Sequence, residues 1–143
     1  MPDEARVQGV KKGTVYMNVW MYVIREFEDA MEDCEAGCID CNEAPGVHAW
    51  DEGVAFYTGT LEGTAFSPGK GKMLYALADK RCKNFATCGK ATAEAKDRLA
   101  GTSEVNEALF KLFRIGQNKL QKAECDVRKE IDQIVSFMTI PQL

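Results

Sequence analysis

The sequence lacks several features by which common protein classes are recognised. It has one histidine in 143 residues, and 18 basic residues against 22 acidic ones. Proteins that bind DNA or RNA usually present a basic surface, so a net charge of −4 argues against a nucleic-acid partner. No apolar run approaches the roughly 18 residues that a membrane-spanning helix needs. We therefore expect a soluble domain that does not span a membrane.

Motifs for common catalytic chemistry are also missing. A single histidine, without a serine or cysteine nucleophile motif, argues against acyl transfer. The segment 69–72 (GKGK) is rich in glycine and lysine, but the Gly-Lys-Ser/Thr of a phosphate-binding loop is absent. With Lys80, Arg81 and Lys83 it could hold an anion, although a plain basic surface helix is the stronger interpretation. A metal-dependent hydrolase would need a general base in addition to its metal ligands, and the sequence offers no convincing one. We therefore expect that the protein is not an enzyme.

Cysteine is present in a number and spread that suit three disulfides. The six residues are Cys34, Cys38, Cys41, Cys82, Cys88 and Cys125. A structural zinc site needs four ligands, commonly as two close pairs, and only Cys38 and Cys41 form such a pair. The pairing stays open, although a local Cys82–Cys88 loop fits the spacing. Disulfides predict an extracytoplasmic location, namely the periplasm, the cell surface or an organelle lumen. Residues 1–6 do not resemble a signal peptide, so we expect that a targeting segment was removed or lies outside this sequence.

Apolar residues recur at helical spacing along most of the chain. The pattern predicts helices over about 11–35, 47–61, 72–83, 103–115 and 126–138, with loops over 38–46 and 63–71 and an ambiguous stretch over 84–101. Gly37 can stop the first helix, and Ser103 offers an N-cap. No segment alternates with period two. We expect an all-α fold, an antiparallel bundle of about five helices with long loops, stabilised by disulfides. Residues 1–143 should form a single domain, which could be one repeat or a fragment of a larger precursor.

One face of the predicted helix over 47–61 combines the histidine with acidic residues. At about 100° per residue, one face carries Trp50, Val54, Tyr57 and Leu61, and the other carries His48, Asp51, Glu52, Ala55 and Gly59. Ala55 and Gly59 are small enough to let another helix approach, which would partly desolvate the polar groups beside them. His48 and Asp51 are three residues apart, a spacing that lets two side chains bind one metal ion.

The first predicted helix can complete such a site. Its residues Tyr22, Glu26, Asp29 and Asp33 lie along one side, flanking the apolar stripe, and helical bundles often build metal sites from facing helices. Oxygen ligands with one imidazole suit iron, manganese or zinc, and a phenolate favours ferric iron. A solvated acidic surface is the alternative interpretation of the same residues.

Three segments carry a resemblance to a known family: 22–30 (YVIREFEDA), 48–63 (HAWDEGVAFYTGTLEG) and 71–82 (GKMLYALADKRC). They resemble the low-iron-inducible periplasmic proteins of algae, a group that includes the green-algal iron-assimilation proteins and the phytotransferrins of marine phytoplankton. The similarity runs from about residue 12 to the C-terminus, and the tryptophan-centred string is its most specific part. The segment 46–51 (GVHAWD) is also similar to the GxHxxE signature of imelysin-type proteins, with Asp51 in place of glutamate.

The resemblance implies an extracytoplasmic, non-catalytic protein that binds Fe(III), with carbonate as a co-ligand. It points to His48 and Asp51 as ligands, to Glu52 as a ligand or supporting acid, and to Glu26 and Tyr57 as further candidates. Tyr57 projects to the opposite face of its helix from His48, so its inclusion depends on the resemblance. The prediction is a ferric-iron-binding domain of an iron-acquisition protein. The alternative is a structural or interaction subunit of a larger complex, for example a lumenal photosynthetic one, that keeps the fold with a vestigial metal site and binds protein partners.

Overall fold

The computed structural model describes residues 2–37, 46–59, 73–89 and 103–142, and nearly all of them are helical. The elements are α1 (Asp3–Lys11), η1 (Lys12–Asn18), α2 (Val19–Ala36), α3 (Val47–Thr58), α4 (Leu74–Phe85), α5 (Glu104–Leu120), α6 (Arg128–Thr139) and η3 (Ile140–Gln142). The only β pairing in these ranges is an isolated bridge between Cys88 and Ser103. Among the described helices, none is long and apolar enough to cross a membrane. The predicted all-α fold is confirmed.

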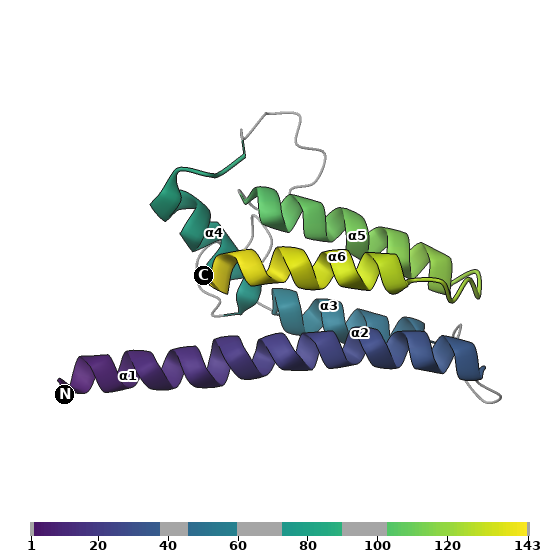
Figure 1. The fold of residues 1–143 in the computed structure, drawn as a ribbon, viewed down its shortest axis with the longest axis horizontal. Coiled ribbons are helices and arrows are strands. Elements are labelled where there is room, and N and C mark those ends of the chain that lie inside the picture. Colours follow the sequence, from purple (N-terminus) through teal and green to yellow (C-terminus); the bar gives the residue numbers. More distant parts are fainter. Residues whose placement is uncertain (1, 38–45, 60–72, 90–102, 143) are drawn as a thin grey trace.

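Two layers of antiparallel helices make the bundle (Figure 1). The continuous rod of α1, η1 and α2 runs along one side, and α3 packs back along α2. The pair α5 and α6 lies over them, and α4 crosses one end of the bundle, near the C-terminal end of α6. Counting the rod as one helix gives the five helices that the apolar periodicity predicts.

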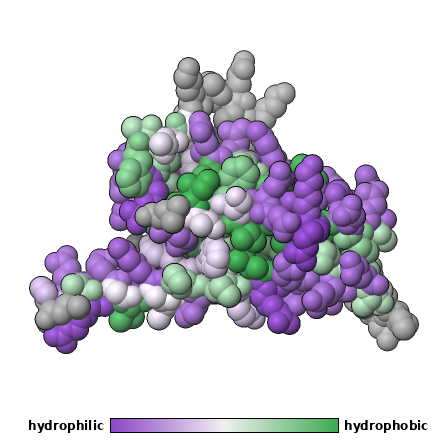
Figure 2. All heavy atoms as spheres, viewed as in Figure 1, coloured by the Kyte–Doolittle hydropathy of each residue, from purple (hydrophilic) through white to green (hydrophobic). Residues whose placement is uncertain are grey.

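The N-terminal arm, residues 2–14, extends the first helix beyond its predicted start at about residue 11. Every residue of this arm is exposed, and hydrophilic side chains with scattered apolar ones cover the face seen in Figure 2. Local signals start the helix, because Pro2 precedes it and Asp3 and Glu4 occupy its first turn, where acidic groups favour the helix dipole. Apolar periodicity could not reveal a helix that buries nothing. The other end was predicted correctly, since Gly37 terminates α2 with a positive φ of 68°.

Trp50 of α3 holds the two layers together. Its indole is fully buried, and its Nε1 donates a 2.9 Å hydrogen bond to the backbone oxygen of Phe113 in α5. A Cβ added at Gly116 would overlap the Trp50 ring, so α5 needs glycine at this point. Helix α5 continues beyond Ile115, the last core residue expected from the sequence, through Gly116 to Leu120.

The small residue that lets α3 approach α2 is Gly53. A Cβ added there would meet the ring of Phe27, whereas Ala55 is exposed to solvent. The expectation that Ala55 and Gly59 line a close helix contact was therefore wrong. Gly59 instead terminates α3 with a positive φ of 71°.

Two disulfides connect described residues. Cys34 at the end of α2 bonds to Cys125 just before α6, across 91 residues of sequence, and Cys82 bonds to Cys88 across 6. The local loop suggested by spacing is thus confirmed, and disulfides of this kind are consistent with an oxidising compartment. The remaining disulfide candidates, Cys38 and Cys41, lie outside the described residues, as do most of the predicted loops over 38–46 and 63–71.

We predict that Gly116→Ala destabilises the protein, because the added methyl group must displace Trp50 and break its hydrogen bond. Overpacking a core in this way costs about 1–3 kcal/mol. The control is Gly9→Ala, since a Cβ at Gly9 meets nothing within 4 Å. Urea unfolding should show a lower midpoint for Gly116→Ala and no loss for Gly9→Ala. Equal midpoints for wild type and Gly116→Ala would contradict the packing described for Trp50.

The two disulfides should contribute unequally to stability. In the chain-entropy treatment, the free energy of unfolding lost on removing a crosslink grows with the loop it closes. The Cys34→Ala/Cys125→Ala variant should lose about 4–5 kcal/mol, and Cys82→Ala/Cys88→Ala about 2 kcal/mol. Denaturant unfolding of both double variants under non-reducing conditions tests this order. The reverse order would show that the Cys34–Cys125 bond is not a main constraint on the bundle.

Candidate functional site

Antiparallel packing of α2 on α3 brings together three of the predicted site residues. Tyr22 of α2 meets Phe56 of α3 with ring centroids 4.8 Å apart. One helical turn from this contact, the carboxyl groups of Glu26 in α2 and Glu52 in α3 lie close enough for Glu52 to raise the pKa of Glu26. Glu52 in turn lies 3.2 Å from the Nε2 of His48, measured from its Oε1. We call Glu26, Glu52 and His48 the carboxylate–histidine cluster.

Glu26 is the buried member of this cluster, with only 7% of its surface exposed. Burial raises the pKa of its carboxyl group above the ordinary value of 4.5, and the negative charges of Glu52 and Asp29 raise it further. Glu26 therefore takes up a proton at a higher pH than an exposed glutamate does, and a positive charge beside it would be favourable.

His48 and Glu52 form the exposed end of the cluster. The His48 side chain is 83% exposed, so its ring has room to turn toward solvent or toward Glu52. The partner of His48 is the residue four positions later, rather than Asp51 three positions later. The carboxylate of Asp51 instead points to α5, where its Oδ1 accepts a 2.8 Å hydrogen bond from Gln117 Nε2. The structure therefore separates the two residues that spacing had ranked first.

Tyr57 lies in the core, away from the cluster. Its hydroxyl donates a 2.6 Å hydrogen bond to Asn106 Oδ1, and the Nδ2 of the fully buried Asn106 donates to the Tyr75 carbonyl oxygen and to Asp79 Oδ1. Ser103, the predicted N-cap of α5, accepts from the Asn106 backbone amide. This network joins α3, α4 and α5, so Tyr57 has a structural role. Sequence reasoning missed Asn106, although its position three residues after an N-cap was visible.

The other acidic residues predicted along α2 have different surroundings. Asp29 pairs with Arg25 at 2.7 Å, and Asp33 is exposed near the end of the helix. Within the described ranges, no three acidic, histidine or cysteine side chains lie close enough to hold a metal ion in their present positions. The cluster therefore offers two adjoining carboxylates and a nearby imidazole that would have to turn to join them.

We predict that Glu26→Gln stabilises the protein at neutral pH. The folded state raises the pKa of Glu26, so its favourable contribution is complete below the ordinary carboxyl pKa and is lost as pH rises through the raised value. Glutamine is neutral at every pH and can still donate to Glu52. The variant should therefore unfold at higher urea concentration than wild type at neutral pH, and this advantage should vanish on acidification.

The matched control is Glu35→Gln, because Glu35 is an exposed acid on the same helix. Its unfolding midpoint should follow that of wild type across the pH range. A Glu26→Gln variant that is less stable at neutral pH, or a difference independent of pH, would contradict the raised pKa of Glu26.

Comparison of the chain with protein-family models, curated proteins and solved structures finds no match. The resemblance carried by segments 22–30, 48–63 and 71–82 therefore stays a prediction.

Proposed function

We propose that this chain is a non-catalytic ferric-iron-binding domain of an extracytoplasmic iron-acquisition protein, and that the carboxylate–histidine cluster binds the metal. The observation that carries the proposal is the close approach of the Glu26 and Glu52 carboxyl groups, contributed by two helices. Two adjoining carboxylates repel each other, and a cation bound between them would relieve that repulsion. Fe(III) is such a cation, since it is hard and highly charged and prefers carboxylate oxygen.

Glu26 and Glu52 are the primary ligands in this proposal, and His48 is the third. Metal ligands must be deprotonated, and the raised pKa of Glu26 means that iron would compete with a proton for this carboxylate. His48 already contacts Glu52 and is exposed, which allows its ring to turn toward a shared metal. This order differs from the one based on spacing, because Asp51 bonds to Gln117 and Tyr57 to Asn106.

Three protein ligands leave part of the coordination shell of Fe(III) to other donors. The resemblance to the algal iron proteins supplies a candidate in carbonate, which binds as an anion beside the metal. Asp29 lies close enough to raise the pKa of Glu26, so it adds negative potential at the site even while it pairs with Arg25. The local excess of negative charge favours a cation over an isolated anion.

A structural or interaction subunit is the alternative function, and the N-terminal arm favours it. Exposed apolar residues lie along the arm and just beyond it: Val7, Val10, Met17 and Met21. A short helix that buries nothing is only marginally stable in water, and a bound partner would stabilise it. In that case the carboxylate–histidine cluster would be a vestigial metal site.

Equilibrium dialysis of Fe(III) citrate with bicarbonate against the purified chain separates these functions. Wild type should bind iron, and Glu26→Gln and Glu52→Gln should each weaken binding on the order of tenfold or more. His48→Ala should also weaken it, whereas Asp51→Asn should behave like wild type. Binding at mildly acidic pH should release a proton, measurable by calorimetry in buffers of different ionisation enthalpy.

Each outcome decides between the two functions. If wild type retains no more iron than Glu26→Gln, the metal-binding proposal is wrong and the structural alternative stands. If Asp51→Asn abolishes binding and Glu26→Gln does not, iron binds elsewhere on α3 than at the cluster.

A further inference from the structure

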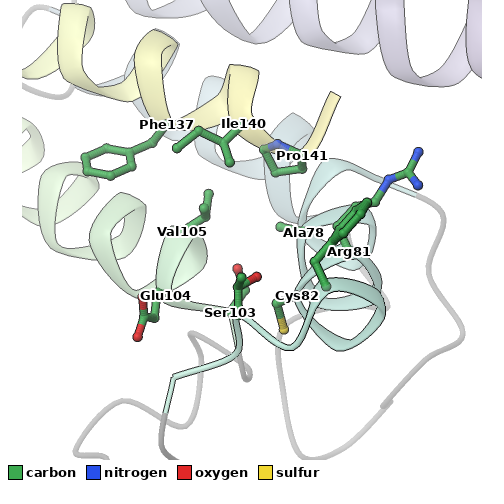
Figure 3. Close-up of a pocket in the computed structure, with 11 residues that line it drawn as sticks. Ala78, Arg81, Cys82, Ser103, Glu104, Val105, Phe137, Ile140 and Pro141 are labelled. Atoms are coloured by element: carbon green, nitrogen blue, oxygen red, sulfur yellow. The ribbon is translucent and has the colours of Figure 1, made fainter. Parts of the chain in front are cut away.

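The N-terminal arm projects beyond the rest of the described bundle (Figure 1). Its residues 2–14 are all exposed, and the side chains of Val7 and Val10 are 49% and 63% exposed. The exposed residues Phe85 and Ile140, by contrast, line a pocket inside the bundle, between α4, α5 and the end of α6 (Figure 3). Helix α1 buries none of its residues. Its two valines are therefore available to a second molecule.

The arm gains little stability from its own sequence. It contains Gly9 and Gly13, and glycine lowers the stability of a helix relative to alanine. A Cβ added at either position would meet nothing within 4 Å, so packing inside the described molecule does not require these glycines. A helix of this kind would be stabilised by pairing with another helix.

Charge is divided between the two ends of α1. Asp3 and Glu4 occupy the first turn and Lys11 the last, with Lys12 directly after it. Two arms that lie antiparallel place the acidic end of each beside the basic end of the other. Complementary charge of this kind selects partners and fixes how they align. The arm is thus complementary to a second copy of itself, as a twofold dimer requires.

The apolar residues of α1 fit the same arrangement. Val7 and Val10 have the three-residue spacing of the a and d positions in a coiled coil. In an antiparallel pair, Val7 of each copy packs against Val10 of the other. Glu4 and Lys11 then both occupy e positions on one flank of the apolar seam, so Glu4 of each copy meets Lys11 of the other. A parallel pair would instead place Arg6 beside Lys11, and both are positive.

We propose that the N-terminal arm pairs antiparallel with the arm of a second copy of this chain. Residue 2 of one arm lies opposite residue 15 of the other, so the pairing uses the exposed residues and leaves the two bundles at opposite ends. Because the contact covers only the arm, it is smaller than the roughly 1,200 Å² of a stable interface. The dimer should therefore be weak, reversible and sensitive to salt. The proposal goes beyond iron binding and does not depend on it.

Sedimentation equilibrium of the whole chain, at concentrations up to the millimolar range, tests this proposal. Wild type should form a dimer whose dissociation constant rises with salt. Glu4→Lys or Lys11→Glu alone sets like charges against each other at two places and should weaken the dimer about tenfold. The double variant Glu4→Lys/Lys11→Glu should recover association, because opposite charges meet again. The matched control is Lys83→Glu, which reverses a charge at an exposed position of α4 and should leave association unchanged.

The double variant separates pairing from the stability of the arm helix itself. Both reversals oppose the helix dipole, so their effects on a single helix add, whereas their effects on an antiparallel pair cancel. Val7→Ser/Val10→Ser removes the apolar seam and should abolish the dimer. Three results would overturn the proposal: a monomer at every concentration, a double charge variant that associates no better than the single ones, or association that survives Val7→Ser/Val10→Ser.

Discussion

The position of Trp50 fixes how α3 is rotated, and the rest of the structure depends on that rotation. Its indole donates to the Phe113 carbonyl oxygen, lies against Gly116 and packs on Phe27 with ring centroids 4.6 Å apart. One side chain therefore connects α3 to both α5 and α2. Because a helix turns by about 100° per residue, fixing Trp50 also decides the direction of every other α3 side chain. Glu52 then faces α2, and Asp51 faces α5.

The same rotation accounts for the electrostatics of Glu26. The core residues Val23 and Phe27 precede and follow it, so packing on α3 carries Glu26 partly into the interface. Glu52 approaches it there, and its negative charge disfavours the ionised form of Glu26. A bundle optimised only for stability would place an apolar residue or an amide at one of these positions.

Sequence patterns predicted the helices that carry apolar stripes and the residues that cap them, because both signals are local. Gly37 and Ser103 end and begin helices as expected, and the Cys82–Cys88 loop follows from short separation. The arm formed by α1 was not predictable from periodicity, since it buries nothing. The partners of Asp51 and Tyr57 were not predictable either, because Gln117 and Asn106 reach them from α5 through tertiary packing. Spacing placed His48 and Glu52 on one face of α3 but could not decide which acid lies beside His48.

The carboxylate–histidine cluster is a place where this fold would gain from a ligand. Burial and two neighbouring negative charges raise the pKa of Glu26, so ionising it at neutral pH lowers the stability of the folded chain. Removing a carboxylate from water without a cation beside it is unfavourable. A cation bound between α2 and α3 would offset that cost, so occupancy of the cluster should increase the stability of the bundle.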